Sequence, residues 1–203
     1  MKKIFQIKDK AVIYKILDQA EYGTLALSLN DVPYAVPLNF VRLEDSLYFH
    51  GALKNRKMKM LSKNQRASFS VVENHSLIDS DFSSTEGLAC PATQFFKSVS
   101  IEGSVEIVES REEKVTMFKA LMQKLQPTGG YKPFEDEAYD TALKSTAVYK
   151  LVSSEMTCKF KFGQHLNDER FEMIIEHLKQ RNTQIDKETI EMMTSQKGIN
   201  HAV

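Results

Sequence analysis

The chain has 203 residues, of which 42% are hydrophobic, enough for one domain with an appended segment or for two small domains. Basic and acidic residues both number 27, so the net charge is zero and gives no global attraction to nucleic acid or anionic membranes. Because no apolar run approaches the roughly 20 residues that span a bilayer, we expect a cytoplasmic protein with no nucleic-acid or membrane partner.

The first half of the chain is predicted to hold one helix and a block of strands. Apolar residues at helical spacing predict an amphipathic helix that follows Asp9 and ends near Gly23. Three apolar segments, separated by turn-forming pairs, then predict a three-stranded antiparallel meander. Its strands are Gly23–Leu29, Val32–Arg42 and Ser46–His50.

A basic segment follows the meander. The chain turns through Gly51 and Ala52 and enters a predicted helix over residues 55–64. Cations in the first turn of a helix oppose its dipole and cost a few tenths of a kcal/mol each, so this pattern favours a bound anion, with phosphate the natural candidate. The basic residues of this acid-free segment are Lys54, Arg56, Lys57, Lys59, Lys63 and Arg66.

The second half alternates strands and helices. Residues 74–91 form a long polar stretch typical of a lid or binding loop. Several strands joined by tight turns are typical of a small β-barrel, and the last segments predict helices. The predicted strands are 67–73, 94–108, 146–152 and 157–162, and the predicted helices are 112–125, 135–144, 168–180 and 187–195.

Two residues interrupt an otherwise apolar strand. Pro37 removes a ladder donor, and Asn39 places an amide where the pattern expects burial, so Pro37–Asn39 either lines a ligand or forms an edge strand with a bulge. Cys90 and Cys158 have no second cysteine at ligand spacing and are read as reduced thiols. No ligand spacing is found either at His75, His165, His177 and His201, so no metal site is expected.

Several segments together carry a family resemblance. They are Tyr22–Ala26, Pro33–Phe40, Leu47–Ala52 with Lys57, and Phe96–Val99. Their order and spacing resemble the FMN-binding split-barrel proteins related to pyridoxamine 5'-phosphate oxidase, and within them the nitroimidazole-resistance (Nim-type) branch. The resemblance implies a mainly β fold with peripheral helices: a split β-barrel domain over residues 1–162 and a C-terminal helical extension over residues 163–203.

The same resemblance implies a homodimer with FMN at its interface. It places the FMN phosphate on the basic segment, with Lys57 as the first choice, and it places a polar contact to the cofactor at Ser98. His50 is expected near the flavin and is the candidate catalytic residue, next to small residues that let a planar ring approach the backbone. The predicted cofactor-binding residues are Pro37, Leu38, Asn39, His50, Gly51, Ala52, Lys54, Arg56, Lys57 and Ser98.

The implied function is that of an FMN-dependent oxidoreductase that reduces a nitro or quinone group on a small-molecule substrate. Pyridoxamine phosphate oxidation fits less well, because that enzyme's substrate signature includes a tryptophan and this chain has none. Two alternatives stay open. One is a haem-binding or haem-degrading split barrel with His165 or His201 as the iron ligand, and the other is a non-catalytic flavin-binding regulator.

Overall fold

The computed structural model of the chain describes residues 1–200 and divides them into two compact units. Residues 10–71 and 99–157 form the first, called here the barrel unit. Residues 1–9, 72–98 and those from Cys158 onward form the second, called here the tail unit. The division of the chain at residue 162 stays a prediction. No helix within the described range is both long and apolar enough to cross a membrane.

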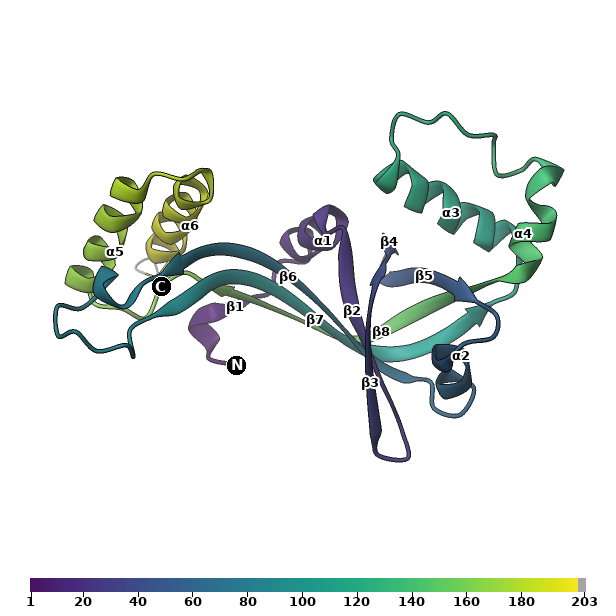
Figure 1. Cartoon of the computed structure of the whole chain (residues 1–203), viewed down its shortest axis with the longest axis horizontal. Helices are drawn as coiled ribbons and strands as arrows, with labels where there is room; N and C mark the ends of the chain where they lie inside the picture. Colours follow the sequence, from purple (N-terminus) through teal and green to yellow (C-terminus); the bar gives the residue numbers. More distant parts are fainter. Residues whose placement is uncertain (201–203) are drawn as a thin grey trace. The chain divides into compact units, whose positions relative to one another are not determined.

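The fold is mainly β, built on one eight-stranded sheet (Figure 1). Its strand order is β3-β2-β6-β7-β8-β5-β4, and β1 pairs with β8 off this path. The pairs β2–β3, β2–β6, β4–β5 and β5–β8 are antiparallel. The strands are β1 (Gln6–Ile7), β2 (Tyr22–Leu29), β3 (Val32–Asn39), β4 (Val41–Leu43), β5 (Ser46–Ala52), β6 (Arg66–Ile78), β7 (Thr93–Val108) and β8 (Thr146–Lys161).

The two end strands of this sheet are neighbours in the chain. Only Phe40 separates β3 at one end from β4 at the other, so the sheet must curve round on itself. Phe40 is fully buried and packs edge-on against Phe69, with 4.9 Å between the ring centres. This arrangement confirms the predicted split β-barrel, with helices at its periphery and at the C-terminus.

The predicted three-stranded meander is wrong. The segment expected as one strand over Val32–Arg42 breaks at Phe40, because this side chain turns into the core. Its first part pairs with β2, while its second part forms a hairpin with β5, which pairs in turn with β8. Turn-forming residues located the strands, but they could not show which partner each strand would take.

The helices lie close to their predicted positions. They are α1 (Lys10–Gln19), α2 (Arg56–Leu61), α3 (Arg111–Leu125), α4 (Asp140–Ser145), α5 (Asp168–Arg181) and α6 (Gln184–Asn200), with single 3₁₀ turns η1 (Lys3–Phe5), η2 (Ser80–Phe82) and η3 (Glu137–Tyr139). Two other expectations fail. The two closing strands are one continuous β8, and the polar stretch predicted as loop from residue 74 begins with the last five residues of β6.

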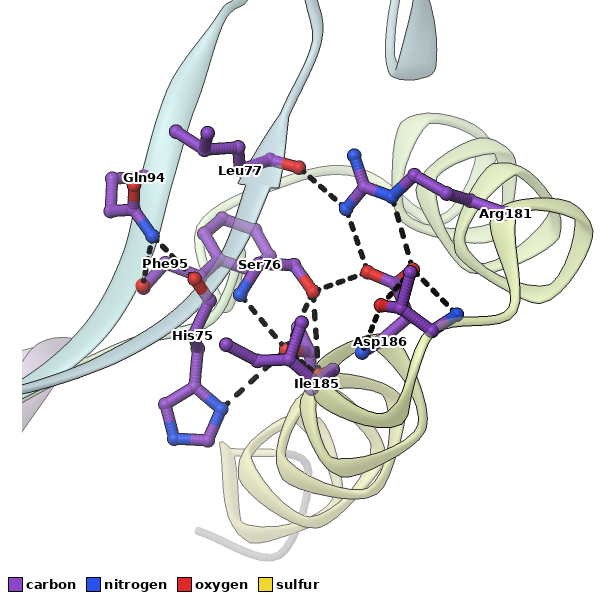
Figure 2. Close-up of polar contacts among 10 residues, drawn as sticks. His75, Ser76, Leu77, Gln94, Phe95, Arg181, Ile185 and Asp186 are labelled. Atoms are coloured by element: carbon purple, nitrogen blue, oxygen red, sulfur yellow. Dashed lines mark hydrogen bonds and ion pairs between the residues drawn. The ribbon is translucent and has the colours of Figure 1, made fainter.

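In the tail unit, α5 and α6 lie side by side and a buried polar network holds them to β6 (Figures 1 and 2). Asp186 is its centre: its carboxylate accepts hydrogen bonds from Arg181 at 2.6 and 3.0 Å and from the Ser76 hydroxyl at 2.6 Å. Thr189 accepts from the backbone N–H of Ser76 at 3.1 Å. Arg181 also donates to the Leu77 carbonyl at 2.9 Å, so one cation ties both helices to the strand.

Candidate functional site

The most distinctive polar group of the barrel unit is the ammonium of Lys57. Strand β5 ends at Ala52, and α2 then carries Lys57 back over the strand it has just left. The Lys57 Nζ donates to the carbonyl of His50 at 3.3 Å and lies 5.3 Å from the ring centre of Phe49 and 5.0 Å from that of Tyr149. The residue is only 8% exposed, so the end of a basic side chain is held inside the unit.

This ammonium is short of partners. Within residues 1–200, Lys57 forms no ion pair, and one carbonyl and two aromatic faces replace its hydration. Burial lowers the pKa of Lys57 below its usual value. A buried charge that lacks an opposite charge is costly, so the position is suited to an anion that contacts Lys57.

The turn beside Lys57 leaves room for this side chain. A Cβ atom at position 51 would lie 3.1 Å from Lys57 Nζ and 3.3 Å from the side-chain nitrogen of Asn55, two tight contacts that the glycine avoids. Asn55 is the N-cap of α2 and accepts from the backbone N–H of Met58 at 2.7 Å. Because α2 has only six residues and is already capped, the site depends on Lys57 more than on the helix dipole.

A second polar group at this place is the hydroxyl of Tyr149. Tyr149 pairs with Phe49 across β5 and β8, and their rings stack with 5.3 Å between centres. Its buried hydroxyl has no hydrogen-bond partner in the described part of the chain. Burial raises the pKa of Tyr149, and the nearby Asn55 side chain offsets part of that rise without reaching hydrogen-bond geometry. An unpaired buried hydroxyl costs about 1–3 kcal/mol, so it too is suited to a polar ligand.

Tyr149 was not among the predicted site residues. The strand that carries it was recognised, but its register against β5, which puts Tyr149 opposite Phe49, has no local signal in the sequence.

His50 lies on the outer side of the same strand. Its ring is exposed at one edge and packs on the other against Phe118 of α3, with 5.4 Å between ring centres. Burial of the packed face, and then the charge of Lys57, lower the pKa of His50 below its usual value. The imidazole is therefore neutral at neutral pH, when it can donate or accept a hydrogen bond.

The other predicted basic residues are arranged differently from Lys57. Lys54 is exposed, as is Ala52, and Arg56 lies with its guanidinium carbon 4.4 Å from the ring centre of Tyr34 in β3. Arg56 therefore ties α2 to β3 by a cation–π contact while its charge stays in solvent. Of the basic segment, Lys57 is the member that points inward.

The amide of Asn39 stands at an exposed position of β3, although the apolar pattern of the segment suggests burial there. Asn39 is exposed, and its side chain donates to the carbonyl of Glu21 at 2.9 Å. Strand β3 is an end strand of the sheet, which is where the missing N–H of Pro37 is tolerated. Leu38 pairs with Gly23 in the ladder to β2 and is half-buried.

Ser98 is the last residue of the tail unit's segment 72–98. Its predicted contact to the cofactor stays a prediction. Among the described residues there is no cluster of three histidine, cysteine or acidic side chains placed to hold a metal ion.

A curved sheet with a buried cation beside its β5–α2 turn is the architecture of a split barrel. The chain belongs to the pyridoxamine 5'-phosphate oxidase family, whose sequence model matches residues 9–160. The predicted resemblance to this superfamily is thereby confirmed. Comparison with curated proteins gave no match.

Solved structures with the same fold include three of particular interest. A candidate 5-nitroimidazole antibiotic resistance protein from Bacteroides thetaiotaomicron is 27% identical, with a TM-score of 0.61 over 76% of this chain and 85% of that one. The flavocytochrome Anf3 from Azotobacter vinelandii is 24% identical, with a TM-score of 0.68 over 85% and 77%. An FAD and haem binding protein from Mycobacterium smegmatis is 19% identical, with a TM-score of 0.64 over 77% and 73%.

Proposed function

We propose that this protein binds FMN and that Lys57 holds the FMN phosphate. The buried, unpaired ammonium of Lys57 carries this proposal, because a phosphate dianion would supply the charge that the site lacks. Gly51 leaves the space beside the ammonium free of a Cβ atom, and the Tyr149 hydroxyl would offer the phosphate a further donor. Family membership supports a flavin in general, as does the FAD named for the Mycobacterium smegmatis protein.

The chemistry we propose is two-electron reduction of a nitro or quinone group on a small-molecule substrate, as in the Nim-type branch. The similarity to the Bacteroides thetaiotaomicron protein supports this choice over other flavin chemistry. When bound, the flavin supplies the electron transfer, and the chain positions it. Lys57 would anchor the phosphate, and the neutral His50 imidazole, with one edge open to solvent, would hydrogen-bond the ring or the substrate.

We assign the remaining predicted residues to the same pocket. Lys54 and Arg56 would add positive potential at its mouth, and Ala52 would let the ring system lie close to the backbone. The exposed side chains of β3 at Pro37 and Asn39, with Leu38 between them, would line the flavin in a homodimer, to which Ser98 would add a polar contact.

The experiment is a titration of the apo-protein with FMN, FAD, riboflavin and haem, followed by absorbance and flavin fluorescence. We expect FMN to bind more tightly than riboflavin by about tenfold or more, because only FMN has the phosphate. Lys57→Glu should weaken FMN binding by about 2 kcal/mol or more while leaving riboflavin binding nearly unchanged. Lys63→Glu, a matched change at an exposed lysine of the same basic segment, should have little effect. Equal FMN affinity in all three proteins would place the anchor elsewhere.

The same titration separates the alternatives. The two candidate haem ligands are His165 and His201, and His201 lies outside the described residues. The His165 ring is exposed and packs edge-on to Phe5 with 5.5 Å between ring centres, but no hydrogen bond in the described range orients it as metal-binding histidines usually are. A haem spectrum without flavin binding would reject our proposal. Flavin binding without NAD(P)H-dependent nitro or quinone reduction above free FMN would favour the regulator.

A further inference from the structure

A second polar pocket lies wholly within the tail unit. It has a volume of about 390 Å³ and is formed by the loop that follows β6, the first residues of β7, the end of β8 and the start of α5. The loop belongs to the polar stretch that the sequence predicts to be a lid or binding loop, and it contributes Ser83 and Cys90 to the lining. Gly163, with a φ of 77°, makes the turn between β8 and α5 that brings these two elements to one pocket.

The polar lining is cationic. Lys161, His165 and Arg170 line the pocket, and none of its lining residues is acidic. In the described chain none of these three side chains forms an ion pair with a carboxylate. Of the acidic residues in the first turn of α5, Asp168 is bound to Lys197 of α6 at 2.6 Å.

Two of the cations are held in place by neutral groups and keep free donors. Arg170 donates from Nε to the Ser83 carbonyl at 2.9 Å and from Nη2 to the Ser83 hydroxyl at 3.2 Å, which leaves three of its five N–H donors. Lys161 donates to the Thr93 hydroxyl and keeps two of three. The loop and β7 therefore orient both cations without neutralising them.

The cations of this region act on one another. Burial, and then the charges of Lys2, Lys161 and Arg170, lower the pKa of His165. Burial, and then the charge of Lys159, lower the pKa of Lys161. Like charges that line one pocket repel each other, so a bound anion would offset this electrostatic repulsion.

The base of the pocket is apolar. Ile78, Phe95 and Ile174 line it and are almost fully buried. We propose that this pocket binds a small molecule with a dianionic head group on an apolar, ring-sized body. Arg170 and Lys161 together match two negative charges, the neutral His165 can donate a further hydrogen bond, and the body would rest on Phe95. A phosphate monoester and a dicarboxylate share this chemistry.

The test is calorimetric titration of the full chain with phenyl phosphate and with phthalate, using benzoate as the monoanionic control and saturating FMN throughout. FMN is present so that the probes cannot occupy the site proposed at Lys57. We expect at least one dianion to bind saturably, and more tightly than benzoate by about tenfold or more. Phenyl phosphate alone would identify a phosphate ligand, and phthalate alone a dicarboxylate.

Variants show where the probe binds. Arg170→Gln and Lys161→Gln should each weaken it about tenfold or more, whereas Lys179→Gln, an exposed change on the same helix, should not. Arg170→Lys keeps the positive charge and is the control for misfolding of the Arg170→Gln variant. Cys90 gives an independent readout, because it lines the pocket and is exposed while Cys158 is buried: the probe should slow its reaction with a thiol reagent. Failure of both dianions to bind, or equal affinity in all variants, would overturn the inference.

Discussion

His50 gives the protein a pH-dependent stability that can be traced to one side chain. Burial and the charge of Lys57 lower the pKa of His50 below its usual value of 6.5. The unfolded chain therefore takes up this proton more readily than the folded one. The stability that the neutral His50 imidazole contributes is complete above the pKa of His50 in the unfolded chain. It is lost as the pH falls through the lower pKa of His50 in the folded chain.

We therefore expect His50→Gln to reduce the acid sensitivity of folding. The free energy of unfolding should fall less between about pH 7 and about pH 5 in the variant than in the parent chain. Urea denaturation at both pH values measures this difference, and His165 contributes equally to both proteins. The same pH dependence in the two would mean that the imidazole is as well solvated in the folded state as in the unfolded one.

Gly103 is a residue whose substitution the fold should not tolerate. A Cβ atom there would lie 2.1 Å from the Val152 carbonyl oxygen of the neighbouring strand β8, and a backbone atom cannot swing aside. Gly103→Ala should lower the free energy of unfolding by about 1–3 kcal/mol or more, as overpacking does. Gly198→Ala is the matched control, because nothing lies within 4 Å of that Cβ in α6. Urea denaturation should show no loss for it, and an unaffected Gly103→Ala would contradict the close strand approach.

Among the elements, α6 is attached through a polar network that has one carboxylate at its centre. Asp186 is fully buried, and hydrogen bonds from Arg181, Ser76 and Thr183 hold its pKa far below its usual range (Figure 2). Asp186→Ala leaves the buried Ser76 hydroxyl without its acceptor and removes the ion pair of the partly exposed Arg181, so we expect a loss of about 1–3 kcal/mol in the stability of this unit. Hydrogen exchange should speed up in α5 and α6 and stay unchanged in β2. Uniform exchange throughout the chain would show that the helices do not open separately.

The pH dependence of this attachment follows from the lowered pKa of the Asp186 carboxyl. The stabilisation by Asp186 is present above its unfolded pKa of 3.8 and disappears only as the pH falls toward the folded value, which lies far lower. Mild acid that protonates histidines should therefore leave α5 and α6 docked.

What the sequence could predict depended on whether the signal was local. The helices of the tail were found from their period, and in the structure Asn167 caps α5, where its side chain accepts from the N–H of Arg170 at 3.0 Å. The prediction of β8 as two strands failed because Ser153 to Met156 reads as a polar turn. In the sheet these residues instead continue a strand with one solvent-facing side.

The candidate site shows the same limit. The sequence showed the basic segment as a run of charges, and the resemblance singled out Lys57. The burial of Lys57, however, arises because its side chain lies over the rings of Phe49 and Tyr149. Tyr149 is about ninety residues further along the chain, so only the pairing of β5 with β8 brings it there. Residues such as Lys54 and Arg56, equal to Lys57 in charge, differ from it only through this tertiary contact.

For the whole molecule, a net charge of zero conceals local separation of charge. Each unit contains a place where buried or half-buried cations lack acidic partners: Lys57 in the barrel unit, and Lys161 with Arg170 in the tail unit. Anion recognition by this chain is therefore expected to be short-ranged. Steering over long distances needs a net field that a neutral chain does not produce.

The proposed homodimer makes oligomeric state and FMN binding linked quantities. If two chains of 23.2 kDa hold FMN between them, the ligand binds the dimer more tightly than the monomer and must strengthen association by the same factor. Sedimentation over a concentration series should give a dimer dissociation constant that falls when FMN is added, and falls less with riboflavin, which lacks the phosphate. Lys57→Glu should remove the effect of FMN while leaving the FMN-free constant unchanged. The contrary result would be FMN binding to the monomer, or a dimer dissociation constant that does not change when FMN is added. Either would mean that the cofactor lies within one chain and that the interface contributes nothing to its binding.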